Sequence, residues 1–221
     1  SDTYADYRCD FELWDCENGI FVYLGCNLES TVFSNTAVRA ALTHAINRDY
    51  LTEHYYGGFA RGVTLPASPQ SPYYNTVLAR RYGYEAGALK QAVDGAMMTD
   101  WQITLLVNSE NAARVAAADR IAQQLSWTGL DVRLEKLPFE DYAAALQAGD
   151  FDLYLGEVVL TADFDLSALL LPGGSLNYGR WYSEQAASLL AQLRLTQGEE
   201  RVQQATRLGQ LLLEEMPIVP I

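Results

Sequence analysis

The sequence predicts an α/β fold in which a mixed sheet is flanked by helices. From about residue 84 onward, short apolar segments alternate with segments whose apolar residues recur every three or four positions, as strands and helices do. This β-α-β-α order is typical of a layered domain whose sheet is at least partly parallel. An Asn-Gly pair near the start indicates an antiparallel hairpin as well. Parallel and antiparallel strands are therefore both expected.

The first expected element is an N-terminal β-hairpin. Residues 7 to 27 alternate in character on both sides of Glu17-Asn18-Gly19. Asn-Gly is the strongest short signal for a two-residue hairpin turn, because both residues tolerate the positive φ that such a turn needs. We therefore expect one strand on each side of residues 17–19.

One long helix is expected next, with Ser34 or Asn35 as its N-cap and Gly57-Gly58 at its end. Residues 59 to 83 then follow without periodicity and are rich in Pro, Ser, Gly and Tyr, so they predict a long irregular connection within the domain. The apolar residues of the expected helix follow the spacing of one buried face: Val38, Ala41, Leu42, Ala45, Ile46 and Leu51.

The remaining elements follow the alternating pattern. The final run, 216–221, is apolar and strand-like, and the chain stops within it, so we expect residues 1–221 to be a single lobe excised from a longer protein. Before this run the pattern predicts a helix near 85–95, a strand at 102–107, a helix at 110–127, a strand at 130–137, a helix at 139–148, a strand at 151–155, and helices near 183–195 and 199–214.

Charge and hydropathy exclude several classes of partner. The chain has 28 acidic and 15 basic residues, a net charge of -13, which repels phosphate backbones and anionic membranes. Nucleic acid is therefore not expected to contact this segment. No apolar run reaches the roughly 20 residues of a membrane-spanning helix. The first residues resemble no signal peptide, so any targeting signal is expected to be removed or upstream.

The cysteines indicate neither a disulfide framework nor a zinc site. Cys9, Cys16 and Cys26 are odd in number, so at most one bridge is possible within the chain. Their spacing matches no zinc signature, and no histidine lies nearby. They are expected to be small apolar strand residues, with a single disulfide as the alternative.

Signatures of catalysis and cofactor binding are missing from the sequence. His44 and His54 would lie about 80° apart around one helix, a poor arrangement for a metal pair. The glycine-rich stretch 57–62 lacks the Gly-Lys-Ser/Thr ending of a phosphate loop. We therefore expect no enzyme activity, metal or cofactor. A hydrolase remains a weak alternative because paired carboxylates occur at Asp150/Asp152, Asp163/Asp165 and Glu214/Glu215, although most such pairs are surface charges.

One segment carries a specific resemblance. Residues 33–49 (FSNTAVRAALTHAINRD) resemble the pattern F-x-D-x-x-V-R-x-A-L-x-x-A-I-D-R of family 5 extracellular solute-binding proteins. Weaker matches follow in the family's order and extend the resemblance from about residue 23 to residue 221. They comprise residues 127–132, 139–142, 149–153, 177–181 and 214–220.

The resemblance implies a periplasmic-binding-protein-like (type II) lobe, with the other lobe built by the chain before and after it. It implies the substrate-binding component of an ABC importer, located outside the cytoplasm in the periplasm or anchored to the membrane. Such a protein binds oligopeptides or similar small solutes between two lobes and delivers them to permease subunits. The alternative is the ligand-sensing domain of a transcriptional regulator with an upstream helix-turn-helix, since the same lobe type occurs there.

The resemblance also implies a ligand site. In peptide-binding relatives, an extended ligand bonds through its backbone to a short extended stretch, and an aspartate just beyond pairs with the ligand's α-amino group. The matching residues are Val159, Leu160 and Thr161 for the stretch and Asp163 for the amine contact. Leu160 stands where relatives often carry tryptophan. This arrangement is chemically sensible because backbone amides and a charged terminus are common to all peptides.

Aromatic and amide side chains are the other candidates for the cleft wall. They are Asn177, Tyr178, Trp181 and Tyr182, together with Tyr73 and Tyr74 in the long connection, because aromatics with a polar tip serve recognition as well as packing; core packing is the alternative role. For Asp163 and Asp165 the alternative is local. Both could form a turn or cap the short apolar run 166–171, which aspartate commonly does.

Overall fold

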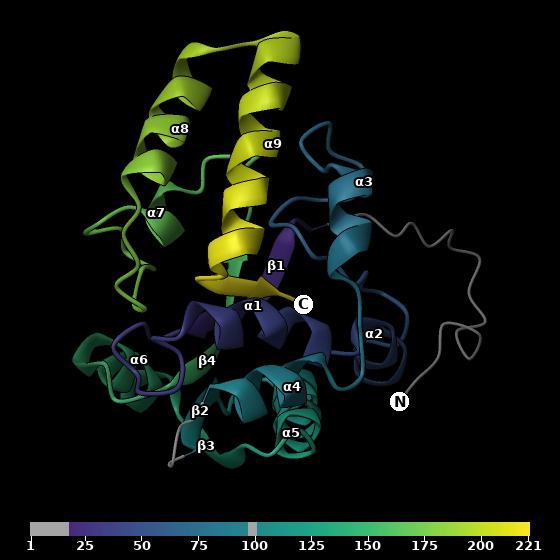
Figure 1. Ribbon diagram of the computed structural model, residues 1–221, viewed down its shortest axis with the longest axis vertical. Helices are drawn as coiled ribbons and strands as arrows, with labels where there is room; N and C mark the ends of the chain where they lie inside the picture. The colour runs from purple at the N-terminus through teal and green to yellow at the C-terminus, as the bar shows by residue number, and fades with distance from the viewer. Residues whose placement is uncertain (1–17, 97–100) are drawn as a thin grey trace, which may run out of the picture.

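The computed structural model describes residues 18–96 and 101–221 (Figure 1). Within these residues, five strands form one sheet in the order β3-β2-β4-β1-β5. Strand β2 is parallel to β3 and β4, whereas β1 is antiparallel to β4 and β5. The predicted mixed sheet is therefore confirmed. The strands are β1 (Ile20–Cys26), β2 (Gln102–Asn108), β3 (Asp131–Leu137), β4 (Leu153–Val159) and β5 (Ile218–Pro220).

Helices cover both faces of the sheet. Those that pack on one face are α1 (Thr36–Ala45), α2 (Arg48–Tyr55), α4 (Ala88–Gly95) and α5 (Ala112–Ser126). The opposite face is covered by α6 (Phe139–Ala148), α7 (Ser167–Leu170), α8 (Glu184–Leu195) and α9 (Gly198–Glu215). Figure 1 shows α8 and α9 as a pair at the top and α4 and α5 at the bottom. The helices flank the sheet, as predicted.

Successive residues of the central strands supply the two cores. In β4, Leu153 and Leu155 belong to the core beneath α1, α4 and α5, whereas Tyr154 belongs to the core beneath α8 and α9. In β2, Leu105 belongs to the first of these cores and Leu106 to the second. Side chains of a strand alternate between faces, so a strand that is buried on both sides must be apolar throughout.

The single long helix predicted after residue 34 is wrong, because the chain forms two helices. The Asn35 side chain accepts hydrogen bonds from two main-chain N–H groups at the start of α1. Ile46 is extended, and the Asn47 side chain accepts a hydrogen bond of 3.0 Å from the Tyr50 N–H to begin α2. The angle predicted between His44 and His54 therefore does not apply, since they lie on different helices.

Most other boundaries agree with the sequence analysis within a few residues. Helix α6 has the predicted ends, whereas β4 starts two residues later than predicted and runs four residues further, to Val159. That extension follows from pairing, because β1 offers a partner along its whole length, with Ile20 opposite Val159. The predicted irregular connection contains the short helices α3 (Thr76–Ala79) and η2 (Arg80–Tyr82).

The N-terminal predictions are only partly covered by the structure. The second arm of the expected hairpin is β1, and Gly19 before it has the positive φ of 69° that a tight turn uses. The first arm, together with Cys9 and Cys16, lies outside the described residues. Cys26 is a buried free cysteine in β1, which confirms for this residue the prediction of a small apolar strand residue.

The burial of Cys26 and Tyr23 predicts a loss of stability in alkali. Burial raises the pKa of the Cys26 thiol from 9.0 to about 12 and that of the Tyr23 hydroxyl from 10.0 to about 12. Both groups ionise more readily in the unfolded chain, so their contribution is complete below pH 9 and declines as the pH rises from 9 to 12.

Thermal unfolding followed by circular dichroism between pH 7 and pH 11 measures this effect. The unfolding temperature is expected to fall above about pH 9, because the free energy of unfolding decreases by up to about 1.4 kcal/mol per pH unit for each group. Cys26→Ala is expected to lessen the part of the decline that begins near pH 9. An unfolding temperature that stays constant from pH 8 to pH 11 would contradict the prediction.

Candidate functional site

The predicted ligand stretch leaves the sheet at the end of β4. Val159 is the last strand residue and is 63% exposed. The Leu160 N–H bonds to the Gly19 carbonyl at 2.9 Å, which keeps the chain beside the start of β1. The next residues form an exposed turn beside an open depression of about 450 Å³. This depression is lined by Thr161, Ala162, Asp163, Asp165 and Ala168.

The outer part of β4 has an open edge. Strand β2 pairs with β4 only as far as Leu155, and no other described strand pairs with that side of Glu157 to Val159. The Leu160 N–H points toward β1 and bonds to the Gly19 carbonyl, which lies opposite it. Since backbone groups alternate in direction along a strand, those of Glu157 and Val159 point away from β1. An extended ligand can add to such an edge through main-chain hydrogen bonds.

Asp163 lies in a tight turn with its carboxylate exposed. The turn is closed by a 3.1 Å hydrogen bond from the Phe164 N–H to the Thr161 carbonyl. The Thr161 hydroxyl, followed by main-chain N–H groups including that of Asp165, holds the pKa of the Asp163 carboxyl below its ordinary value. The carboxylate is therefore charged at neutral pH and accessible to a ligand.

Two arginines approach this turn but leave the Asp163 carboxylate without a salt bridge. Arg194 donates to Asp165 Oδ2 at 3.1 Å and to Ser167 Oγ at 3.0 Å. Arg201 donates to the main-chain carbonyl of Asp163. Among the described residues, no cation forms an ion pair with Asp163. A ligand ammonium group is the natural partner for this charge.

Asp165 has the structural role that the sequence analysis kept as an alternative. Its Oδ1 accepts a 2.9 Å hydrogen bond from the Ser167 N–H, two residues on, which forms a turn just before α7, whose N-cap residue is Leu166. The Ser167 hydroxyl first, and Arg194 to a lesser extent, lower the pKa of the Asp165 carboxyl. Asp163 occupies the turn but keeps an exposed carboxylate, so its predicted contact with an amine stays a prediction.

Asn177 supports a loop with its side chain. Its amide donates to the carbonyls of Leu171 at 3.1 Å and Trp181 at 2.8 Å, and its Oδ1 accepts from the Trp181 N–H at 3.1 Å. Both amide hydrogens are therefore used within the loop. That Asn177 contacts the ligand stays a prediction. Such a contact would use the remaining lone pair of Asn177 Oδ1.

The predicted aromatic candidates divide between packing and exposure. Tyr178 is half-buried and lies edge-on to Tyr154, with ring centres 5.8 Å apart. Trp181 is buried, and its Nε1–H donates to Glu215 at 2.8 Å, so it belongs to the core. Tyr182 is exposed, whereas Tyr73 stacks on Phe164 beside the Asp163 turn, with ring centres 5.4 Å apart.

Sequence reasoning missed Arg194 and Arg201. They lie on α8 and α9, and 29 and 38 residues separate them from the aspartates that they contact. No local motif marks either residue, because in the sequence an arginine on the polar face of an amphipathic helix cannot be told from any other surface charge. Neither a group of three or more metal-binding side chains nor a helix able to span a membrane is found in the described ranges 18–96 and 101–221.

Sequence comparison identifies related proteins. Residues 12–178 match the family model described as "Bacterial extracellular solute-binding proteins, family 5 Middle". The glutathione-binding protein GsiB of Salmonella paratyphi A is 24% identical over 213 residues, which cover 90% of this chain and 41% of that protein. The oligopeptide-binding protein AppA of Bacillus subtilis is 28% identical over 129 residues, which cover 52% of this chain and 24% of AppA.

Solved structures share the fold. The oligopeptide-binding protein AppA of Bacillus subtilis, in complex with a nonapeptide, has a TM-score of 0.80 at 21% identity, covering 91% of this chain and 44% of that one. The murein tripeptide binding protein MppA of Escherichia coli has a TM-score of 0.81 at 20% identity, covering 91% and 42%. These similarities confirm the predicted periplasmic-binding-protein-like (type II) fold. The chain spans about two-fifths of the length of relatives such as GsiB.

Proposed function

Because the chain belongs to the bacterial extracellular solute-binding proteins, family 5, we propose that it is the ligand-facing lobe of an ABC importer's receptor. The receptor binds oligopeptides or similar small solutes between this lobe and a second one. It acts outside the cytoplasm, anchored to the membrane or free in the periplasm, and hands its ligand to the permease subunits. The role requires binding and closure of the two lobes, without catalysis.

The observation that carries this proposal is the Asp163 carboxylate beside the open edge of β4. The edge offers main-chain groups of Glu157 and Val159 to an extended chain, and Asp163 offers an unpaired charge a few residues further on. Together they match what all peptides share, a repeating backbone and a charged amino terminus. A peptide with a free amino group is therefore the ligand class that this wall of the site favours. The relatives AppA and MppA, whose names state that they bind peptides, support the same choice.

A peptide-pool experiment on the full-length protein tests the proposal. Purified protein is incubated with a pool of tripeptides to pentapeptides, washed, and the retained peptides are identified by mass spectrometry. The same pool after N-acetylation is the comparison. We expect retention of the free pool and little retention of the acetylated one. Equal retention of the two pools would contradict the amine contact but support peptide binding. Retention of neither pool would overturn the proposed ligand class.

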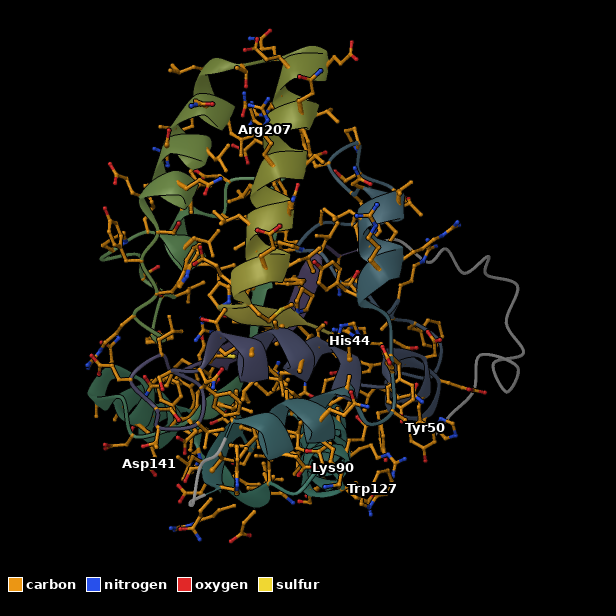
Figure 2. All side chains as sticks on the ribbon, in the orientation of Figure 1. His44, Tyr50, Lys90, Trp127, Asp141 and Arg207 are labelled. Carbon is orange, nitrogen blue, oxygen red and sulfur yellow. The ribbon has the colours of Figure 1, made fainter. Side chains whose placement is uncertain are left out.

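The variant Asp163→Asn tests the amine contact in the same assay. It removes the charge and keeps the shape, so retention of the free pool is expected to fall about tenfold to a hundredfold, as for the loss of a charge-assisted hydrogen bond. Asp141→Asn is the matched control, because Asp141 is exposed on α6, away from the turn (Figure 2). Unchanged retention by Asp163→Asn would show that this carboxylate does not contact the ligand.

The parent reading frame separates the two contexts in which such a lobe occurs. An export signal followed by a β-rich lobe is expected upstream of this segment. A helix-turn-helix domain there, without an export signal, would instead make the protein a cytoplasmic sensor and contradict the importer role.

A further inference from the structure

The turn that carries Asp163 is joined to α9 by one side chain, that of Arg201. Its Nη2 donates to the main-chain carbonyl of Asp163. Its guanidinium also lies over the ring of Tyr73, 5.8 Å from the ring centre. Tyr73 comes from the irregular connection between α2 and α3, so three segments far apart in the sequence meet at this turn.

The backbone of the turn needs such external support. Phe164, directly after Asp163, has a φ of 58°, in the left-handed region that a bulky side chain rarely adopts. Its ring is buried and stacks on Tyr73 at 5.4 Å. A strained residue keeps its conformation only where its surroundings hold it. Here the hold comes from Tyr73 on the ring of Phe164 and from Arg201 on the preceding carbonyl.

The hydrogen bonding of Arg201 indicates that its role concerns the turn. Its Nε is buried and has no hydrogen-bond partner, which is costly for a charged donor. Its Nη2 nevertheless reaches the Asp163 carbonyl, and Arg201 makes no salt bridge within the described residues. The hydrogen bond that the guanidinium makes is therefore directed at the turn.

We propose that Arg201 is a positioning residue that fixes the direction of the Asp163 carboxylate and so sets the preference of the site for ligands with a free amino group. This inference rests on the proposed function. An arginine suits the role because its planar fork can donate to a carbonyl while its face covers an aromatic ring, whereas the ammonium of lysine is a compact charge that does one or the other.

The test compares Arg201→Met with the native full-length protein in the peptide-pool experiment. The measured quantity is the ratio of free to N-acetylated peptide retained. For R201M this ratio is expected to fall about tenfold, the effect of one hydrogen bond to a charged group. R201K is expected to give an intermediate ratio and serves as the second variant if R201M folds poorly. Arg207→Met is the matched control, because Arg207 is exposed on the same helix (Figure 2).

The outcomes separate this inference from the proposed function. If the native protein prefers free over N-acetylated peptides and R201M and R201K show the same preference, only the proposed role of Arg201 is overturned. This holds even if the unfolding temperatures of the two variants fall. Native protein that retains both pools equally overturns the amine contact and this inference with it. Native protein that retains no peptide overturns the proposed ligand class as well.

Discussion

Replacing Gly179 by alanine is expected to destabilise the protein severely, because the added methyl group would meet main-chain atoms of the central sheet. A Cβ at this position would lie 2.1 Å from the main-chain oxygen of Cys26 and 3.2 Å from its carbonyl carbon. Cys26 is the last residue of β1, which lies between β4 and β5 in the sheet. A main-chain carbonyl there cannot move aside as a flexible side chain can. We therefore expect a loss of about 4 kcal/mol or a failure to fold.

The position matters for the site as well as for stability. The Gly179 carbonyl accepts a 3.1 Å hydrogen bond from the Leu28 N–H, so Gly179 attaches the loop of Asn177 and Tyr178 to the end of β1. Displacing this loop would also disturb Tyr154, whose hydroxyl donates to the Leu176 carbonyl at 3.2 Å. Peptide retention by the full-length G179A protein is therefore expected to fall together with its stability.

Thermal unfolding of G179A checks the prediction, with Gly95→Ala as the control. No atom lies within 4 Å of a Cβ at Gly95, which ends α4, so that change is expected to be neutral or to stabilise by about 0.5 kcal/mol. An unfolding temperature for G179A within roughly 2 °C of the native value would contradict the close contact, since even 1 kcal/mol shifts it by at least that much.

The second large effect is expected from Arg48→Met. Arg48 is 6% exposed, and its guanidinium bonds to the Pro220 carbonyl at 2.9 Å, the Thr43 carbonyl at 2.9 Å and the Thr43 hydroxyl at 2.8 Å. Burial lowers its pKa to about 10, so it is still protonated at neutral pH. Methionine fills a similar volume but leaves these buried acceptors unpaired. We expect a loss of about 3 kcal/mol.

Urea denaturation measures this loss, with Arg81→Met as the control. Arg81 is exposed in η2, so its replacement is expected to change the free energy of unfolding by less than about 0.5 kcal/mol. Arg48 connects the start of α2 to β5, at the edge of the sheet. A variant whose midpoint in urea equals that of R81M would show that the carbonyl of Pro220 needs no donor from α2.

Two arginines of the segment at 33–49 make long-range hydrogen bonds. Arg39 donates to the Glu215 carbonyl at 3.0 Å and Arg48 to the Pro220 carbonyl. Both residues thus join the first two helices to the end of the described chain. The sequence pattern that supported the family resemblance therefore contains two residues with a long-range structural role, which nothing in their spacing revealed.

Elements whose signals are local could be predicted from the sequence. Helix α6 follows Pro138 and ends before Gly149, whose φ of 82° suits a helix C-terminus, so both of its ends were identified. The break between α1 and α2 also had a local signal in Asn47, a good N-cap residue, but the continuous apolar spacing on both sides favoured one helix.

The amino-acid sequence by itself determined the strands, most of the helices and the aspartates of the turn, because periodicity and capping act over a few neighbouring residues. Tertiary structure alone decided how far β4 extends, because its last residues are ordered by pairing with β1. It also decided which aspartate stays free: Arg194 and Arg201 come from distant helices, and one neutralises Asp165 while the other bonds only to the backbone of Asp163. Such contacts depend on the packing of α8 and α9 against the sheet, which no short segment of the chain encodes.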